Sequence, residues 1–185
     1  MSEPEDPLAP GPDLDLDPDL SDTPDAPASA DTARYRQVLG HFATGVTVVT
    51  AAVGGEPAGL AVNSFTSVSL EPPLVAICVA NMSATWSKIR EAGWFCVNVL
   101  ADDQEDVCRV FAGRGTHKFQ GMGWKPAESG APILNDVLAW VDCAVVAEHD
   151  GGDHVIVIGE VRDMAVVREG LPLVFYRGGY GRFQP

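Results

Sequence analysis

The 185-residue sequence lacks the signatures of several common enzyme classes. No G-x-G-x-x-G follows an expected strand and no G-x-x-x-x-G-K-[ST] loop is present, so a nicotinamide or flavin enzyme here would not be of the Rossmann kind. The G-x-S-x-G elbow is also absent, so nothing indicates a serine hydrolase. No apolar run reaches the roughly 18 residues that a membrane-spanning helix needs, so we expect no membrane insertion.

The sequence also offers little for a metal site or a disulfide framework. Its four cysteines contain no C-x-x-C pair, and its four histidines do not fall at zinc-ligand spacings with them. Three of the cysteines (Cys78, Cys96 and Cys143) sit in apolar, strand-like runs, which favours reduced and buried thiols. We therefore expect no metal.

Charge is unevenly spread along the chain. Residues 1–31 hold ten of the 26 acidic residues and no Lys or Arg, and residues 1–32 hold seven of the 14 prolines. Removing those ten negative charges from the total of −14 leaves −4, so the remainder is only mildly acidic. We expect residues 1–32 to be a disordered acidic tail, either a partner contact or only a solubilising segment, and residues 33–185 to form one domain.

The same charge pattern bears on partners and location. Clustered Lys and Arg, which a nucleic-acid footprint needs, are missing, so we expect no nucleic-acid partner. An acidic, proline-rich N-terminus is neither a secretory signal nor a basic transit peptide, so we expect a cytoplasmic protein.

Strand patterns dominate the rest of the chain. Helical spacing or capping predicts helices over 35–42, over 83–91 with Ser83 as N-cap and Gly93 just after its end, and from 102–103 to about 112. Apolar and β-branched runs between Gly/Pro turns predict strands over 46–53, 58–64, 66–70, 74–80, 95–100, 138–147, 155–166 and 171–176. Because the helices are too few for repeated β-α-β units, we expect a mainly β, closed or partly open barrel.

A phosphate site is one interpretation of the segment 81–85. Hydroxyl groups and free backbone N–H groups at a helix N-terminus suit an anion. The alternative is an ordinary N-cap that follows a hydroxyl-rich edge strand. These residues alone leave both interpretations open.

An ordered set of motifs resembles the flavin reductase family, the small reductase components of two-component flavin-dependent monooxygenases. The motifs are FATGVTVVT (42–50), NSFTSVSLEPPL (63–74), FCVNVL (95–100), HKF (117–119), GGDH (151–154) and FYRGGY (175–180). The resemblance covers residues 34–183 and leaves the acidic tail outside. It implies an antiparallel Greek-key split β-barrel of the FMN-binding type, usually a homodimer with the flavin near the subunit interface.

The resemblance also implies an activity. It is the NADH- or NADPH-dependent reduction of FMN or FAD by hydride transfer to flavin N5, with the reduced flavin supplied to a partner monooxygenase. A split-barrel oxidase that retains its flavin and a non-catalytic flavin-binding or electron-carrier protein remain alternatives. Hydride transfer depends on stacking the two rings about 3–3.5 Å apart and needs no nucleophile, so the absence of a triad is expected.

Positions matched to the family give the expected site. The strand residues that would border the flavin ring and ribityl chain are Gly59, Leu60, Ala61, Asn63, Ser64, Phe65, Thr66, Cys78, Val79 and Ala80. Ser83 and Thr85 would bind its phosphate. The loop residues that would complete the cofactor site are Lys118, Phe119, Asp153, Tyr180 and Arg182. His154 would contact the nicotinamide as orienter or proton donor and is the one expected catalytic residue.

Several of these residues also have a structural interpretation. His154 could be a polar turn residue, and Lys118 could be an ordinary surface lysine. The four tryptophans are expected in the core or an interface rather than against the flavin. Asp142, in the middle of an apolar strand, is expected to be a buried polar group with a partner and no catalytic role. The preferred flavin, the preferred nicotinamide nucleotide and the identity of the oxygenase stay open.

Overall fold

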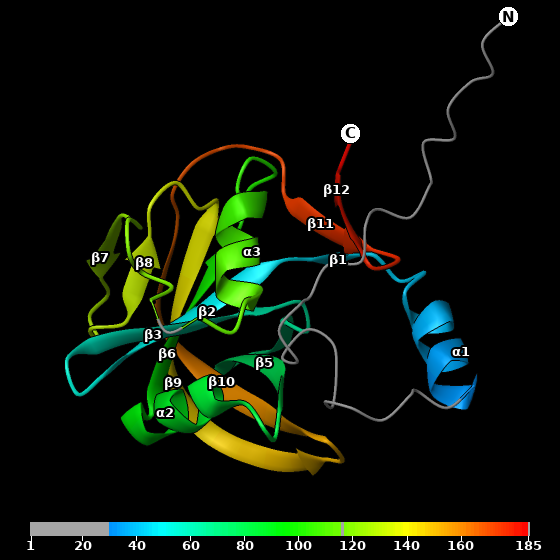
Figure 1. Ribbon diagram of the computed structural model, residues 1–185. Coiled ribbons are helices and arrows are strands. Elements are labelled where there is room, and N and C mark those ends of the chain that lie inside the picture. The colour runs from blue at the N-terminus through cyan, green and yellow to red at the C-terminus, as the bar shows by residue number, and fades with distance from the viewer. Residues whose placement is uncertain (1–29, 116, 185) are drawn as a thin grey trace, which may run out of the picture.

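The structure is a computed structural model that describes residues 30–115 and 117–184. Nearly all of the expected acidic tail lies outside the described residues. The described chain is mainly β, as expected, and its largest unit is a seven-stranded sheet in the order β3-β2-β6-β9-β10-β5-β4 (Figure 1). Its strands are β2 (Thr47–Val53), β3 (Glu56–Val62), β4 (Thr66–Leu70), β5 (Pro73–Ala80), β6 (Trp94–Val99), β9 (Ala139–Gly151) and β10 (His154–Val166).

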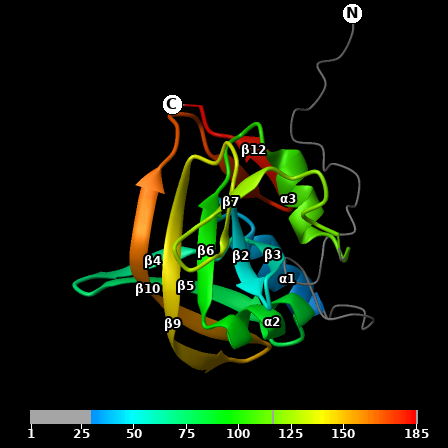
Figure 2. The same ribbon diagram turned by 90° about the vertical axis from the view of Figure 1, so that its left-hand side faces the viewer.

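The sheet must curl because its two edge strands are consecutive in sequence. All neighbouring strands pair antiparallel, and β3 and β4 lie at opposite edges although only residues 63–65 connect them. The four steps from Val62 to Thr66 span about 14 Å at most, so the edges have to approach each other. Figure 2 shows the resulting barrel, with the β4–β5 hairpin protruding from it. The predicted antiparallel split barrel is therefore confirmed.

Ser64 fastens the barrel at this seam. Its hydroxyl oxygen accepts a hydrogen bond from the Cys78 backbone N–H at 2.8 Å and donates one to the Cys78 carbonyl at 2.9 Å. One side chain thus satisfies both backbone groups of a β5 residue that would otherwise face the gap between the edges.

Three hydrophobic clusters account for the packing of the described chain, and the first two position the site. The first fills the barrel with residues such as Leu60, Ile77 and Phe95, and helix α2 (Ala84–Ala92) closes one end with Trp86 and Ile89. The second lies between the outer face of the sheet and helix α3 (Glu105–Ala112). Because α3 covers one outer face, β2 is buried on both faces over its first five residues, and its two threonines are buried together with its apolar residues.

Two small sheets complete the fold. Strand β1 (Thr44–Gly45) pairs with β11 (Leu173–Tyr176), which pairs with β12 (Gly179–Arg182). Strand β7 (Trp124–Pro126) pairs with β8 (Pro132–Leu134) over the barrel wall. Helix α1 (Ala30–Leu39) stands at the side of the barrel in Figure 1.

Some expected element boundaries are wrong. The first helix begins at Ala30 and ends at Leu39 instead of covering 35–42. Strands β1, β7, β8 and β12 were not expected. These strands have two to four residues, and their hydrogen-bond partners are supplied by tertiary structure rather than by a local pattern.

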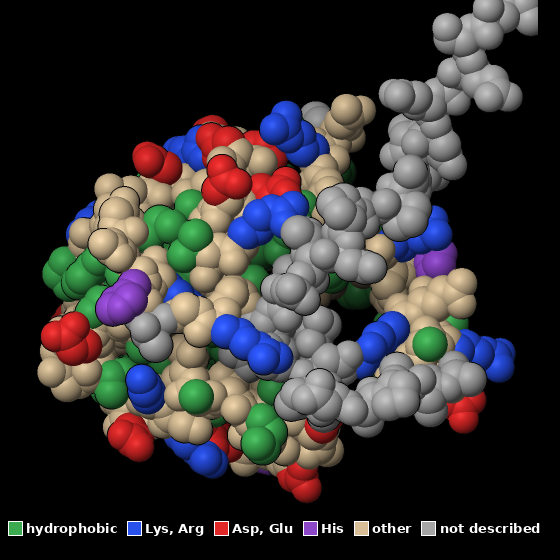
Figure 3. All heavy atoms as spheres, viewed as in Figure 1, with side chains coloured by type: hydrophobic (Ala, Val, Ile, Leu, Met, Phe, Trp, Pro, Cys, Tyr) green, Lys and Arg blue, Asp and Glu red, His purple; other side chains and the backbone are tan. Residues whose placement is uncertain are grey.

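Charge on the molecular face of Figure 3 is mixed, with Lys and Arg side chains interspersed among acidic and apolar ones.

In the part of the chain that the structure describes, no helix has both the length and the apolar character to cross a bilayer.

Candidate functional site

His154 lies where the β9–β10 hairpin meets the start of α2. It pairs with Ala80 in the β5–β10 ladder. Asn81, the next residue, donates from its backbone N–H to the Asp153 carbonyl at 2.9 Å and from its amide to the Gly152 carbonyl at 2.8 Å. The hairpin turn and the approach to α2 are thereby held as one unit, so His154 has a defined position beside the helix N-terminus.

Asp153 orients the His154 ring. Its carboxylate lies 2.8 Å from Nδ1 of His154, whose side chain is 38% exposed. The hydrogen bond from His154 lowers the pKa of Asp153, so this carboxyl group is ionised at neutral pH and acts only as an acceptor. Nδ1 must then carry the proton, which leaves Nε2 as the ring atom that can contact a ligand.

The N-terminus of α2 has an ordered cap and the polarity that an anion would need. Ser83 caps the helix, since its hydroxyl accepts the Trp86 backbone N–H at 3.1 Å, and Gly93 ends the helix with a φ of 72°. This agrees with both predicted caps. The N–H groups of the first turn, including that of Thr85, have no partner within the helix, and together with the helix dipole they favour a negative group.

The strands next to this helix present alternate residues to the outside. Cys78 and Ala80 on β5 are half-buried, whereas Val79 between them is fully buried in the barrel core. Leu60 on β3 is likewise buried in that core. Val79 and Leu60 can therefore offer only backbone groups to a ligand. Burial raises the pKa of the Cys78 thiol, so it is protonated at neutral pH.

A second group of expected site residues lies under α3. A Cβ on Gly59 would come within 2.8 Å of the Phe111 ring and 3.3 Å of the Phe119 ring, so only glycine fits there. Ala61 is fully buried in the same cluster. Lys118 is 8% exposed, and its ammonium group donates to the Phe111 carbonyl at 2.8 Å. Lys118 is thus no ordinary surface lysine, since it stabilises the C-terminal end of α3.

The C-terminal hairpin is also anchored on α3. The Cys108 thiol lies 3.2 Å from the Tyr180 hydroxyl, and the Arg109 guanidinium lies 5.2 Å from the centre of the Tyr180 ring. Burial, followed by the contact with Cys108, raises the pKa of Tyr180, so its phenol stays neutral. Arg182 lies 3.8 Å from the Asp102 carboxylate. These contacts place Tyr180 against α3 and Arg182 against the turn that precedes it.

The connection between β3 and β4 lies between the site residues beside α2 and those under α3. Phe65 packs against the barrel core, and Thr66 is exposed at the start of β4. The Asn63 side chain is half-buried and makes no hydrogen bond within the described part of the chain. Its amide is therefore available to a ligand seated at the seam that Ser64 closes.

These features fit a flavin. The unbonded Asn63 amide suits a polar ring edge, the small side chain of Ala80 leaves room beside it, and the α2 N-terminus suits a phosphate. A bound flavin supplies a ring that accepts a hydride. Sequence reasoning included Asn81 only in a possible phosphate segment and missed its hydrogen bonds to the β9–β10 hairpin, because the hairpin is distant from Asn81 in sequence.

A split antiparallel barrel with a capped helix N-terminus next to an oriented histidine points to the class of flavin-binding split-barrel oxidoreductases. Comparison with known proteins agrees: residues 39–184 match the family described as flavin reductase like domain. The chain therefore belongs to the flavin reductase family.

The chain is similar to three proteins of known name or structure. A flavin reductase of Pseudomonas putida is 48% identical over 84% of this chain and 92% of its own. HsaB, the reductase subunit of a flavin-dependent monooxygenase of Rhodococcus jostii, is 45% identical over 86% of this chain and 82% of its own. SgcE6, a NADH:FAD oxidoreductase of Streptomyces globisporus, has been solved in complex with NAD and FAD fragments. Its sequence is 40% identical, and its structure superposes with a TM-score of 0.80 over 84% of this chain and 94% of its own.

Proposed function

We propose that this protein reduces FMN or FAD with NADH or NADPH and releases the reduced flavin to a separate monooxygenase. The observation that carries the proposal is the hydrogen-bonded unit formed by Asp153, His154 and Asn81 at the N-terminus of α2. It sets a group that can contact a nicotinamide beside a site that can hold a flavin phosphate. The similarity to a monooxygenase reductase subunit supports the separate oxygenase.

Each group in the proposed site has a definite task. Ser83 and Thr85 hold the phosphate, and Asn63 with the outward backbone of β3 and β5 binds the ring edge. His154 orients the nicotinamide through Nε2 while Asp153 keeps its ring fixed. Gly59, Phe119 and Lys118 shape the wall under α3. Holding the nicotinamide and the flavin in position accounts for the rate of hydride transfer, so no nucleophile is required.

Two further features belong to this proposal. We propose a homodimer, because apolar side chains on β4 and on the end of β10 are exposed, Leu70 at 91% and Val166 at 74%. A cytoplasmic location is proposed because Cys78, Cys96, Cys108 and Cys143 are all unpaired, which suits a reducing compartment.

A steady-state assay tests the activity. Purified protein is mixed with NADH or NADPH and with FMN or FAD in turn, and the loss of nicotinamide absorbance is followed. Turnover that rises with added free flavin is expected. A tightly bound flavin without turnover would instead support an electron carrier and contradict the proposal, and turnover independent of added flavin would indicate a retained cofactor.

His154→Gln tests the role of the histidine. We expect kcat/KM for the nicotinamide nucleotide to fall roughly 10- to 100-fold, mainly through KM, because the contact that orients the ring is lost. The dissociation constant of FMN should stay within about twofold. The control is His41→Gln, since His41 lies on the connection after α1 and is exposed. Equal losses in both variants would contradict the assignment.

A further inference from the structure

Ser64 lies at the point where the barrel splits. The β4–β5 ladder ends with the pair Thr66 and Ala76, and the same register continued would set Ser64 opposite Cys78. The backbone does not continue that ladder, because residues 63–65 connect β4 to β3. The Ser64 side chain takes the open ladder position and bonds to both backbone groups of Cys78, at 2.8 and 2.9 Å. A side chain therefore replaces main-chain pairing where the two edges separate.

The Ser64 hydroxyl group is already engaged by the fold. A hydroxyl has one proton to donate, and in Ser64 that proton goes to the Cys78 carbonyl. One of its two lone pairs accepts the Cys78 N–H. The neighbouring Asn63 differs, since its half-buried amide makes no hydrogen bond within the described residues. These two adjacent residues thus have different roles, because only the Asn63 side chain is available to a ligand.

The same two hydrogen bonds set the width of the proposed flavin site. On one side of the seam is Asn63, and on the other is the outward face of β5 with Cys78 and Ala80. Ser64 joins the two sides, so it fixes their separation before a ligand arrives. A site that is ordered in advance spares the ligand the entropic cost of ordering it.

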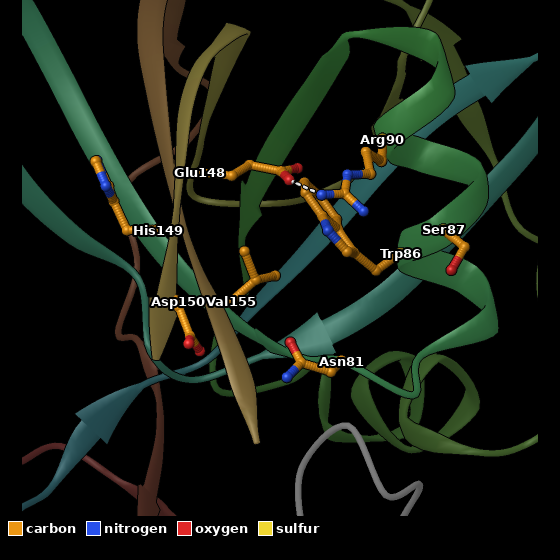
Figure 4. A pocket seen from close by; sticks show the side chains of 8 residues that line it. All are labelled: Asn81, Trp86, Ser87, Arg90, Glu148, His149, Asp150 and Val155. Carbon is orange, nitrogen blue, oxygen red and sulfur yellow. Dashed lines mark hydrogen bonds and ion pairs between the residues drawn. The ribbon is translucent and has the colours of Figure 1, made fainter. Parts of the chain in front are cut away.

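The α2 end of β5 is fastened independently of Ser64. Asn81, the residue after Ala80, bonds to the β9–β10 hairpin, and an ion pair joins Arg90 on α2 to Glu148 on β9 (Figure 4). These contacts hold the end of the site where the phosphate is proposed to bind. Loss of the Ser64 bonds should therefore loosen the ring end and leave the helix start in place.

We propose that Ser64 is a positioning residue for the flavin ring and not a ligand of the flavin. Its hydroxyl closes the seam, and the closed seam holds Asn63 and β5 at the separation that the ring needs. The inference rests on the proposed function, because it takes the flavin to lie at this seam. The family resemblance places Ser64 beside the ring, and its action there runs through Cys78.

Substitutions at Ser64 test the role through flavin affinity. Ser64→Ala removes both hydrogen bonds, and we expect the dissociation constant of FMN, measured by quenching of flavin fluorescence, to rise about tenfold. Because bound flavin orders the loosened seam again, kcat at saturating FMN and KM for NADH should stay within about twofold. Ser64→Thr keeps a hydroxyl and should restore the dissociation constant to within about threefold of the wild type.

The matched control is Ser69→Ala, on the same β4–β5 hairpin. The Ser69 hydroxyl accepts the exposed Glu71 backbone N–H at 3.3 Å, so its loss should leave FMN binding unchanged. If Ser64→Ala does not fold, as judged by its melting temperature, Ser64→Val replaces it. Valine has the shape of threonine without the hydroxyl, so the Val and Thr variants differ in the hydrogen bonds alone.

A double-mutant cycle separates positioning from direct contact. If Ser64 acts by holding Asn63 in place, Ser64→Ala should raise the dissociation constant of FMN by about threefold or less in an Asn63→Ala background. Two independent flavin ligands would instead give effects that multiply. That result would overturn the positioning role.

A measurement without flavin tests the seam itself. Cys78 is half-buried, whereas the other three cysteines are buried (Cys96, Cys108 and Cys143), so a maleimide reagent should label Cys78 first, as peptide mass spectrometry can verify. We expect Cys78 to react about fivefold faster in Ser64→Ala than in the wild type or Ser64→Thr, because the seam opens more often. Equal rates in all three proteins would overturn the proposal.

The outcomes distinguish this inference from the proposed function. Faster labelling of Cys78 with unchanged FMN binding would make Ser64 a residue of the fold only and overturn its positioning role, while FMN turnover with NADH still supported the reductase. Weaker FMN binding in Ser64→Ala, in a protein whose wild type turns over neither FMN nor FAD, would support the role of Ser64 and overturn the proposed function.

Discussion

Asn98, at the residue scale, holds the barrel wall to the β7–β8 hairpin. It is fully buried, and its amide nitrogen donates to the Val48 and Pro132 carbonyls at 3.1 and 3.2 Å. Its amide oxygen accepts the Leu134 backbone N–H at 2.8 Å. A buried amide with both ends paired is stabilising chiefly because its loss leaves several buried groups unpaired.

We therefore expect Asn98→Ala to lower the free energy of unfolding by about 2–3 kcal/mol, measured by urea denaturation. The control is Asn135→Ala, since Asn135 is exposed and its side-chain amide makes no hydrogen bond within the described residues. A loss below about 0.5 kcal/mol for Asn98→Ala would show that water replaces its bonds.

Residues of the candidate site differ in how far the sequence could predict them. The pair Asp153 and His154 could be found because a Gly-Gly turn and its flanking residues form a local motif. The inward direction of Leu60 and Val79 follows from the two-residue period of a strand, and this period shows that only their backbones can meet a ligand. The contact of Lys118 with the Phe111 carbonyl could not be predicted, since it depends on how a loop packs on α3.

Helix α2, at the element scale, is where prediction from the sequence worked best. Its N-cap Ser83 and terminal Gly93 act through neighbours within a few residues, so their roles are visible in the sequence. Helix α3 shows the contrary case. Its cap was expected at Asp102 or Asp103, but these carboxylates pair with Arg182 and Arg168, which are far away in the sequence, and the helix begins after Gln104.

Ser83→Ala tests whether the cap of α2 also serves the ligand. We expect a loss of about 1 kcal/mol in the free energy of unfolding, since the hydroxyl no longer accepts the Trp86 N–H. We also expect KM for FMN to rise severalfold, because the hydroxyl and the ordered helix start both favour the phosphate. Ser83→Thr keeps a hydroxyl cap and should behave nearly as the wild type. A stability loss without any change in KM would make Ser83 a cap only.

The whole molecule has an exposed apolar edge where its proposed partner subunit would bind. Strand β4 ends the sheet, and β10 pairs with β5 only from His154 to Glu160, so the rest of β10 has β9 alone as a neighbour. Leu70 on β4 is 91% exposed and Met164 on β10 is 64% exposed. Open strand edges with apolar side chains are rarely left uncovered in monomers, and a two-fold axis would cover the same edge on both copies.

Leu70→Glu combined with Met164→Glu should separate the subunits, because two copies of each new carboxylate would be buried close to one another. Light scattering after size exclusion should give about twice the chain mass of 19.6 kDa for the wild type and a single chain for the double variant. Val110→Glu, at an exposed valine on α3, should leave the dimer intact. The double variant should also lose flavin affinity if the flavin site lies at the interface. A wild-type protein that elutes as a monomer would rule out the dimer.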